Sequence, residues 1–84
     1  MFEIRYAKSV TKDLRKIDVA HRSAIKAGIE DLIRFPDIPQ IKRLTNHPIA
    51  DYRLRIGNYR ILFDVDWEAK VIYILKVGHR KDVY

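Results

Sequence analysis

Residues 52–63 of the chain read YRLRIGNYRILF, two alternating segments separated by a Gly-Asn pair. Apolar side chains alternate with arginines before the pair, and a similar alternation resumes after it. This period of two is typical of half-buried β-strands. Because Gly-Asn favours a two-residue turn of the primed type, the stretch predicts a β-hairpin with Gly57 and Asn58 as its loop.

The register of this hairpin assigns side chains to its two faces. With a two-residue loop, Arg55 lies opposite Arg60, and opposed residues share a face of the sheet. Arg53 lies one pleat away on that face. The other face is expected to receive helices, because it carries the aromatic and aliphatic side chains of Tyr52, Leu54, Ile56, Tyr59, Ile61 and Phe63.

Three arginines on an uncovered face indicate a binding site for an anion. Like charges placed opposite each other destabilise a strand pair, so the presence of these arginines indicates a functional role rather than a structural one. Guanidinium suits phosphate because its planar fork donates two parallel hydrogen bonds. The alternative is a solvated edge whose long side chains shield strand surface. The anion site is favoured by a net charge of +6, from 17 Lys and Arg against 11 Asp and Glu.

The segment before the hairpin predicts a strand followed by two helices. Residues 1–6 alternate apolar and polar side chains, as a strand does. Asp18 separates two helical patterns, and the second is expected over about residues 19–34, ending before Pro36 and Pro39. The first pattern places four apolar residues on one helical face: Ala7, Val10, Leu14 and Ile17.

The second helix carries one unusual residue, Gly28. Glycine lowers helix propensity by about 0.8–1 kcal/mol relative to alanine, and here it suggests a close approach of the first helix. The core side of the second helix is expected to consist of Ala24 or Ile25, Ile29, and Leu32 with Ile33. The two helices then form a helical hairpin.

A third long strand is predicted after the hairpin, over residues 70–77. Residues 71–75 are apolar on both faces, so this strand is expected inside the sheet. The predicted order is β-α-α-β-β-β. This is an α+β fold, with a twisted antiparallel sheet and a helical hairpin on one face. A chain of 84 residues is expected to form a single domain over residues 1–84.

The tail, GHRKDVY at residues 78–84, follows a strand that lies beside the hairpin. It can therefore swing over the same face as the arginines. Arg80 would add a fourth positive charge, His79 carries the side chain that titrates nearest neutral pH, and Tyr84 can stack on a base or exchange a proton. The alternative is a frayed, solvated C-terminus.

Other site classes lack their sequence patterns. Without cysteine there is neither a disulfide nor a thiolate zinc site, and three scattered histidines have no metal-ligand spacing. No P-loop, GxGxxG or GxSxG motif occurs. The N-terminus lacks a secretory pattern, and the longest apolar run is too short to span a membrane. We expect a soluble, cytoplasmic protein with no metal, cofactor or membrane partner.

The hairpin sequence and the tail VGHRKDVY at residues 77–84 together resemble the RelE/ParE superfamily of type II toxin–antitoxin toxins, and most of all its RelE branch. The resemblance extends over essentially the whole chain. It implies an mRNA interferase, which is an endoribonuclease that cleaves mRNA in the ribosomal A site and inhibits translation. It also implies three partners: the ribosome, mRNA, and a cognate antitoxin, often bound in a heterotetramer.

The resemblance also implies a mechanism and its residues. The ribose 2′-OH attacks the adjacent phosphate without a metal and leaves a 2′,3′-cyclic phosphate. The basic pair that holds RNA falls on Arg53 and Arg55, and the arginine that stabilises the transition state falls on Arg60. The basic residue and the tyrosine of the tail fall on Arg80 and Tyr84.

One departure from the family affects proton transfer. Some relatives carry lysines where this chain has Arg53 and Arg55, and arginine cannot act as a general base because it does not lose its proton. Tyr84 or His79 must then take that role, and replacing His79 should flatten the pH–rate profile near neutrality. Lys81, in the same basic run, is a further expected RNA-binding residue.

Two other functions fit the same fold. A ParE-like toxin would poison DNA gyrase and cleave nothing, although such chains generally lack the full set of basic residues and tyrosine found here. A non-catalytic RNA-binding module would use the same cationic face without cleavage.

Overall fold

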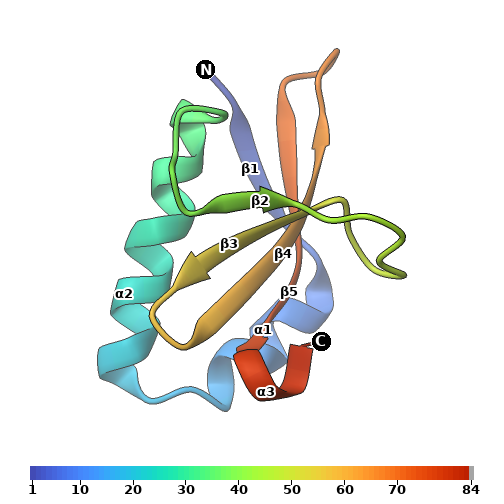
Figure 1. Ribbon diagram of the computed structural model, residues 1–84. Helices are drawn as coiled ribbons and strands as arrows, with labels where there is room; N and C mark the ends of the chain where they lie inside the picture. The colour runs from blue at the N-terminus through green and yellow to red at the C-terminus, as the bar shows by residue number, and fades with distance from the viewer. Residues whose placement is uncertain (84) are drawn as a thin grey trace.

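The computed structural model describes residues 1–83 as an α+β fold, and Tyr84 lies outside the described residues (Figure 1). The elements follow the chain as β1 (Glu3–Tyr6), α1 (Lys8–Arg15), α2 (Val19–Glu30), the 3-10 helix η1 (Asp31–Arg34), β2 (Ile41–Arg43), β3 (Tyr52–Ile56), β4 (Tyr59–Asp66), β5 (Val71–His79) and α3 (Arg80–Val83). The predicted fold class is confirmed. The strand β2 and the helix α3 are additions to the predicted order.

Within residues 1–83, five strands form one sheet in the order β1-β5-β4-β3-β2. Strands β2 to β5 pair antiparallel, whereas β1 pairs parallel to β5, with Ile4 opposite Ile72. The sheet is therefore mixed, and the prediction of a wholly antiparallel sheet was wrong in this detail. Alternation along a strand reveals its two faces but carries no information on its direction, which the intervening helices set here.

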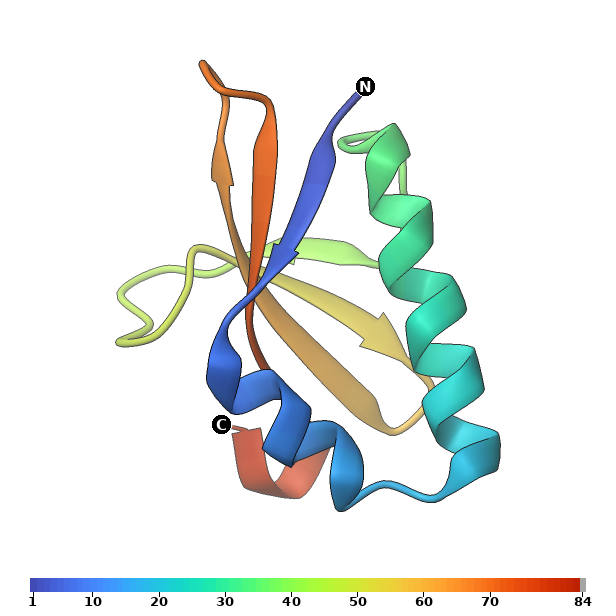
Figure 2. The ribbon, with the colours of Figure 1, turned by 180° about the vertical axis from the view of Figure 1, so that it is seen from behind.

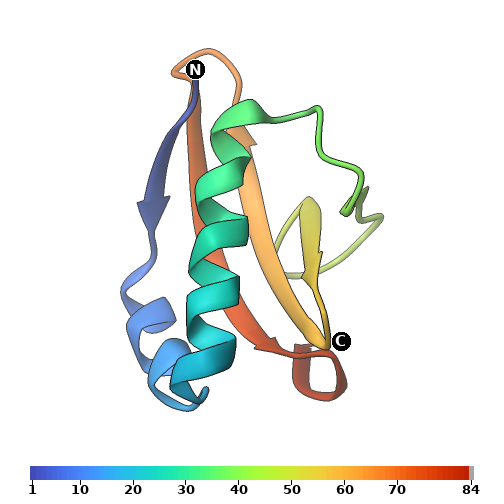
Figure 3. The same cartoon turned by 90° about the vertical axis from the view of Figure 1, so that its left-hand side faces the viewer.

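Helices α1 and α2 pack against one face of the sheet, and α3 lies toward the other side at the end of β5 (Figures 2 and 3). The predicted stripe of α1 is confirmed, since Val10 and Ile17 are buried and Leu14 is partly buried against the same core. In α2, Ile25 and Ile29 are buried and Ala24 is exposed. Ile33 was predicted in the core but is 38% exposed, because the chain tightens into the 3-10 helix η1.

At Gly28, α2 approaches the sheet closely. A Cβ atom placed there would lie 2.0 Å from Cδ1 of Ile56 and 3.9 Å from Cδ2 of Leu54, both on β3. The close approach is thus to β3, and the prediction of an approach to the first helix was wrong. Periodicity shows which side of a helix is buried, but it does not show which element covers that side.

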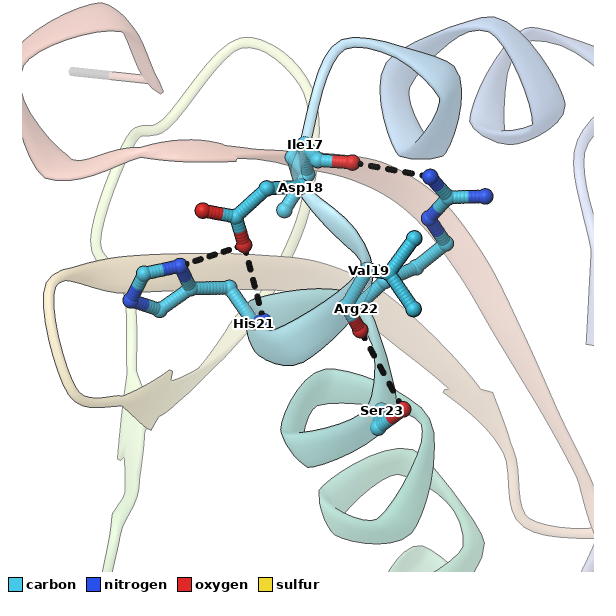
Figure 4. A network of polar contacts seen from close by, with 6 residues as sticks. All are labelled: Ile17, Asp18, Val19, His21, Arg22 and Ser23. Atoms are coloured by element: carbon cyan, nitrogen blue, oxygen red, sulfur yellow. Dashed lines mark hydrogen bonds and ion pairs between the residues drawn. The ribbon is translucent and has the colours of Figure 1, made fainter.

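Side-chain hydrogen bonds of Asp18 and Arg22 stabilise the short link between α1 and α2 (Figure 4). Asp18 is the N-cap of α2, and its Oδ1 accepts hydrogen bonds from the backbone N–H of His21 at 2.9 Å and from the His21 ring. The Arg22 guanidinium donates to the carbonyl of Ile17 at 3.1 Å. The residue that interrupts the helical pattern is therefore the residue that starts the second helix.

A second, smaller apolar cluster lies on the sheet face opposite α1 and α2. Leu62 and Ala50 are buried there, with Leu44 and Leu75 packed around them. The loop between β2 and β3 carries two of these residues, and the Asp51 N–H at its end donates to Oδ1 of Asp64 at 2.6 Å. The loop therefore covers the middle of the face opposite the helices, and that face is open toward the turn between β3 and β4.

Candidate functional site

The predicted hairpin register is confirmed by the strand pairing. Arg55 lies opposite Arg60, Arg53 lies opposite Leu62, and Ile56 lies opposite Tyr59. Gly57 has a φ of +57°, the sign that a primed turn requires at its first central position. The three arginines share the face that the helices leave open, with Arg55 exposed and Arg53 and Arg60 half-buried.

Two lysines join the arginines on this face. Lys42 of β2 lies opposite Arg53, and Lys76 of β5 lies opposite Leu62. We call this group the arginine face: Lys42, Arg53, Arg55, Arg60 and Lys76. Sequence reasoning missed both lysines because assigning them needs the pairing of β2 and the position of the irregularity between Leu62 and Phe63 in β4.

The Arg60 guanidinium is held at the hairpin turn by backbone carbonyls. Its Nη1 donates to the carbonyl of Gly57 and to that of Tyr59, both at 3.0 Å. Gly78 lies opposite Arg60 on β5, so no side chain projects beside it from that strand. These bonds hold the Arg60 head group at the turn between β3 and β4.

The Arg53 side chain is half-buried, and part of its head group is enclosed. Its Nε is buried and has no hydrogen-bond partner among the described residues. A guanidinium within a cluster of cations suits a phosphate, because its planar fork donates two parallel hydrogen bonds.

The basic tail begins next to the hairpin turn. The backbone N–H of Arg80 donates to the carbonyl of Asn58 at 2.8 Å, which links the start of α3 to the loop between β3 and β4. The side chains of Arg80 and Lys81 are exposed. The structure therefore brings the tail cation Arg80 to the same end of the sheet as Arg60.

His79 lies on the helix-facing side of the sheet, because it pairs opposite Tyr59 in β5. The two ring centroids are 5.6 Å apart, with the rings nearly perpendicular. The expectation that the tail swings as one unit over the arginines is therefore not met for His79. The reason is that β5 continues to His79, two residues beyond its predicted end, and alternation along the strand then fixes this side chain. Tyr84, the other expected proton carrier, lies outside the described residues.

The pKa values of two groups, Asp18 at the start of α2 and Tyr6 on β1, are shifted from their ordinary values. The pKa of Asp18 is lowered because its carboxylate accepts hydrogen bonds from the backbone and the ring of His21. The pKa of Tyr6 is raised by burial and by the nearby charge of Glu30. Among residues 1–83, no group of three or more His, Cys, Asp or Glu side chains is arranged to hold a metal ion.

A separate groove of about 400 Å³ lies between β1, α1 and α2. Its floor is mostly apolar and includes Val10, Leu14 and Ile29, and its lining also includes the cations of Arg22 and Lys26. No helix within the described part of the chain has the length and apolar character needed to cross a membrane.

The sequence is similar to known toxins over nearly its whole length. Residues 4–84 match the family described as the ParE toxin of type II toxin–antitoxin systems, parDE. The chain is 34% identical to Toxin RelE3 of Methanocaldococcus jannaschii, covering 98% of this chain and 94% of that protein. It is 30% identical to Toxin RelG of Mycobacterium tuberculosis, covering 99% and 95%.

The fold is similar to toxins solved together with their antitoxins. The RelBE2 toxin–antitoxin complex of Mycobacterium tuberculosis contains a chain with a TM-score of 0.82 and 29% identity, covering 94% of this chain and 98% of that one. The archaeal RelE-RelB complex of Pyrococcus horikoshii contains one with a TM-score of 0.74 and 29% identity, covering 96% and 97%.

Proposed function

Because this chain belongs to the ParE toxin family of type II toxin–antitoxin systems, within the RelE/ParE superfamily, we propose that it is an endoribonuclease that cleaves mRNA on the ribosome and so inhibits translation. The observation that carries the proposal is the opposition of Arg55 and Arg60, with Arg53 beside them, on the open face of the hairpin. Like charges at opposed positions cost stability, and a bound phosphate backbone offsets that cost.

RNA binding is assigned to Arg53, Arg55 and Lys81. The arginines lie on the sheet face opposite α1 and α2, from the pairing with Leu62 toward the turn between β3 and β4, and Lys81 extends the positive charge from α3. Contacts to phosphate oxygens are independent of sequence, so these residues hold the RNA backbone without reading its bases.

Cleavage is assigned to Arg60 and Arg80, which stabilise charge on the phosphoryl oxygens. The 2′-oxygen forms a bond to phosphorus as its proton leaves, and the bond to the 5′-oxygen breaks as that oxygen gains a proton. The products are a 2′,3′-cyclic phosphate and a 5′-hydroxyl. Neither a metal nor a cofactor enters this scheme. Proton transfer is assigned to Tyr84 or His79, since arginine retains its proton.

A translation extract programmed with a defined mRNA tests this function. The wild-type chain should produce cuts at codon-spaced positions with cyclic phosphate ends. Arg60→Ala should abolish cleavage while ribosome binding is retained. Arg34→Ala is the matched control, because Arg34 lies on η1 and pairs with Asp31 away from the arginine face. RNA that stays intact with the wild-type chain would contradict the proposal.

A gyrase-poisoning toxin is the second candidate, favoured by the ParE description of the matching family. It predicts gyrase-dependent DNA damage with intact mRNA in the same cells. Binding of RNA without cleavage or DNA damage would instead indicate a non-catalytic RNA-binding module.

The proposed protein partner is a cognate antitoxin that lays an acidic amphipathic helix or extended segment on the toxin, in a heterotetramer. The groove between α1 and α2, with its apolar floor and basic rim, supports this choice, and the sheet edge at β2 is a further candidate site. Lys26→Glu should weaken antitoxin binding measured by calorimetry. The exposed Lys12 lies outside the groove, so Lys12→Glu should have a smaller effect.

A further inference from the structure

His79 occupies the position immediately before α3, and its ring accepts a backbone hydrogen bond from that helix. Nδ1 of His79 accepts from the backbone N–H of Lys81 at 3.2 Å. A side-chain acceptor that binds the N–H of the second helical residue has the geometry of an N-cap, a position usually held by Ser, Thr, Asp or Asn. An imidazole performs the same task here, and it satisfies one of the free N–H groups at the start of the helix.

The orientation of this ring is fixed by Tyr59. The Tyr59 ring contacts His79 at a centroid distance of 5.6 Å and His21 of α2 at 5.3 Å. Tyr59 thus lies between two imidazoles, one at the start of α2 and one at the start of α3. Through Tyr59, the residue that caps α3 therefore packs against β4, and Tyr59 in turn contacts α2.

The turn between β3 and β4 contacts both arginines that are proposed to stabilise the transition state. It binds the guanidinium of Arg60 and the backbone N–H of Arg80, the residue that follows His79. The carbonyls of Gly57 and Tyr59 accept from Nη1 of Arg60, and the carbonyl between them, that of Asn58, accepts from the N–H of Arg80. Three consecutive carbonyls therefore fix the Arg60 head group and the first residue of α3. The relative placement of Arg60 and Arg80 depends on this junction.

We propose that His79 is a positioning residue, which caps α3 and thereby holds Arg80 and Lys81 in register with Arg60. This inference rests on the proposed function for its cleavage measurement. The capping contact also bears on the choice between Tyr84 and His79 as the residue that transfers protons. When Nδ1 accepts from Lys81, a neutral ring carries its proton on Nε2 and is a donor there, so the capping tautomer is not a base at Nε2.

The test compares His79→Ala with His79→Asn in the ribosome cleavage assay. Alanine removes the cap and should lower kcat at least about tenfold, because misplacement of a catalytic group by about 1 Å can cost as much as a hundredfold. Asparagine restores an acceptor favoured at N-caps but carries no titratable proton, so it should recover most of the wild-type kcat at every pH. Thermal unfolding of both variants establishes that they are folded.

The chain offers a matched control in His47. Nδ1 of His47 accepts from the backbone N–H of Ile49 at 3.1 Å, which is the same contact to the second following residue, in the loop before β3. His47→Ala should therefore leave kcat unchanged. An asparagine variant as slow as the alanine variant would assign proton transfer to His79 and overturn the proposal, and so would an alanine variant as fast as wild type.

A second measurement does not depend on RNA cleavage. The amide proton of Lys81, followed by NMR, should exchange faster with solvent in His79→Ala than in wild type, and His79→Asn should restore its protection. Unchanged exchange in the alanine variant would show that His79 is not the cap. If exchange behaves as expected but the wild-type chain leaves mRNA intact, the proposed function fails and the capping role stands.

Discussion

Gly28 is a residue at which a side chain has no room. The helix α2 approaches β3 so closely that a methyl group at position 28 would overlap Cδ1 of Ile56, at 2.0 Å, and press on its Cγ1, at 3.1 Å. Glycine therefore lowers the helix propensity of α2 in exchange for a close contact between helix and strand.

A double-mutant cycle measures this exchange. Gly28→Ala alone should be neutral or destabilising, since the gain of about 1 kcal/mol in helix propensity is opposed by an overpacking cost of about 1–3 kcal/mol. In an Ile56→Val background, which removes Cδ1, the same change should raise the free energy of unfolding. Urea denaturation of the four proteins checks the sign, and equal effects in both backgrounds would show that the two residues do not couple.

At the scale of elements, the start of α2 depends on one carboxylate. The folded-state pKa of Asp18 lies below its ordinary value of 3.8, first because the backbone N–H of His21 donates to it and then because the His21 ring does. A lowered carboxyl pKa contributes stability above the unfolded-state pKa, and that stability is lost as the pH falls through the folded-state pKa.

Asp18→Ala should therefore destabilise the protein at pH 7, and the difference from wild type should narrow as the pH falls from about 4 toward 2. Urea denaturation across this pH range measures the difference in the free energy of unfolding between the variant and wild type. Asp37→Ala, in the loop after η1, serves as the comparison and should show a smaller effect at neutral pH. A penalty that is constant with pH would indicate that the charged cap contributes nothing.

At the scale of the whole molecule, a long-range hydrogen bond joins α1 to the end of β5 that lies away from β1. Oδ2 of Asp13 accepts from the backbone N–H of Val77 at 3.0 Å, on a part of β5 that lies beyond its pairing with β1. Helix α1 thus satisfies a strand edge that β1 is too short to reach.

Removing this acceptor should destabilise the fold globally. Asp13→Ala should lower the free energy of unfolding by about 1–3 kcal/mol, because it leaves a part-buried N–H without its partner. Asp13→Asn keeps an acceptor oxygen and should cost less. Lys12→Ala, on the neighbouring exposed position, should stay within about 0.5 kcal/mol of wild type. Equal values for the alanine and asparagine variants would argue against the hydrogen bond as the cause.

The proposed RNA binding should depend on salt, because the protein carries a net charge of +6. Each phosphate contact to single-stranded RNA contributes about 0.7 to the slope of log K against log salt concentration. Arg53→Ala and Arg55→Ala should each lower that slope by about this amount in fluorescence titrations with a short RNA. Arg34→Ala should leave it unchanged. If neither Arg53→Ala nor Arg55→Ala changed the slope, these arginines would not contact RNA phosphates.

The hairpin, its register and the helical stripes could be read from the sequence because they depend on local patterns. A two-residue turn fixes which residues lie opposite each other, so Arg55 and Arg60 could be paired without coordinates. Helical spacing over α1 and the residues just after it likewise identified Val10 and Ile17 as core residues. These features are set by residues within a few positions of one another.

The tertiary structure alone decided the features that join distant segments. They are the parallel pairing of β1 with β5, the loop that covers Leu62, the approach of Gly28 to Ile56, and the lysines that complete the arginine face. His79 belongs with them, because its face follows from where β5 ends and its partner Tyr59 lies on another strand. Periodicity gives each element an inner and an outer side, but long-range packing selects what each side meets.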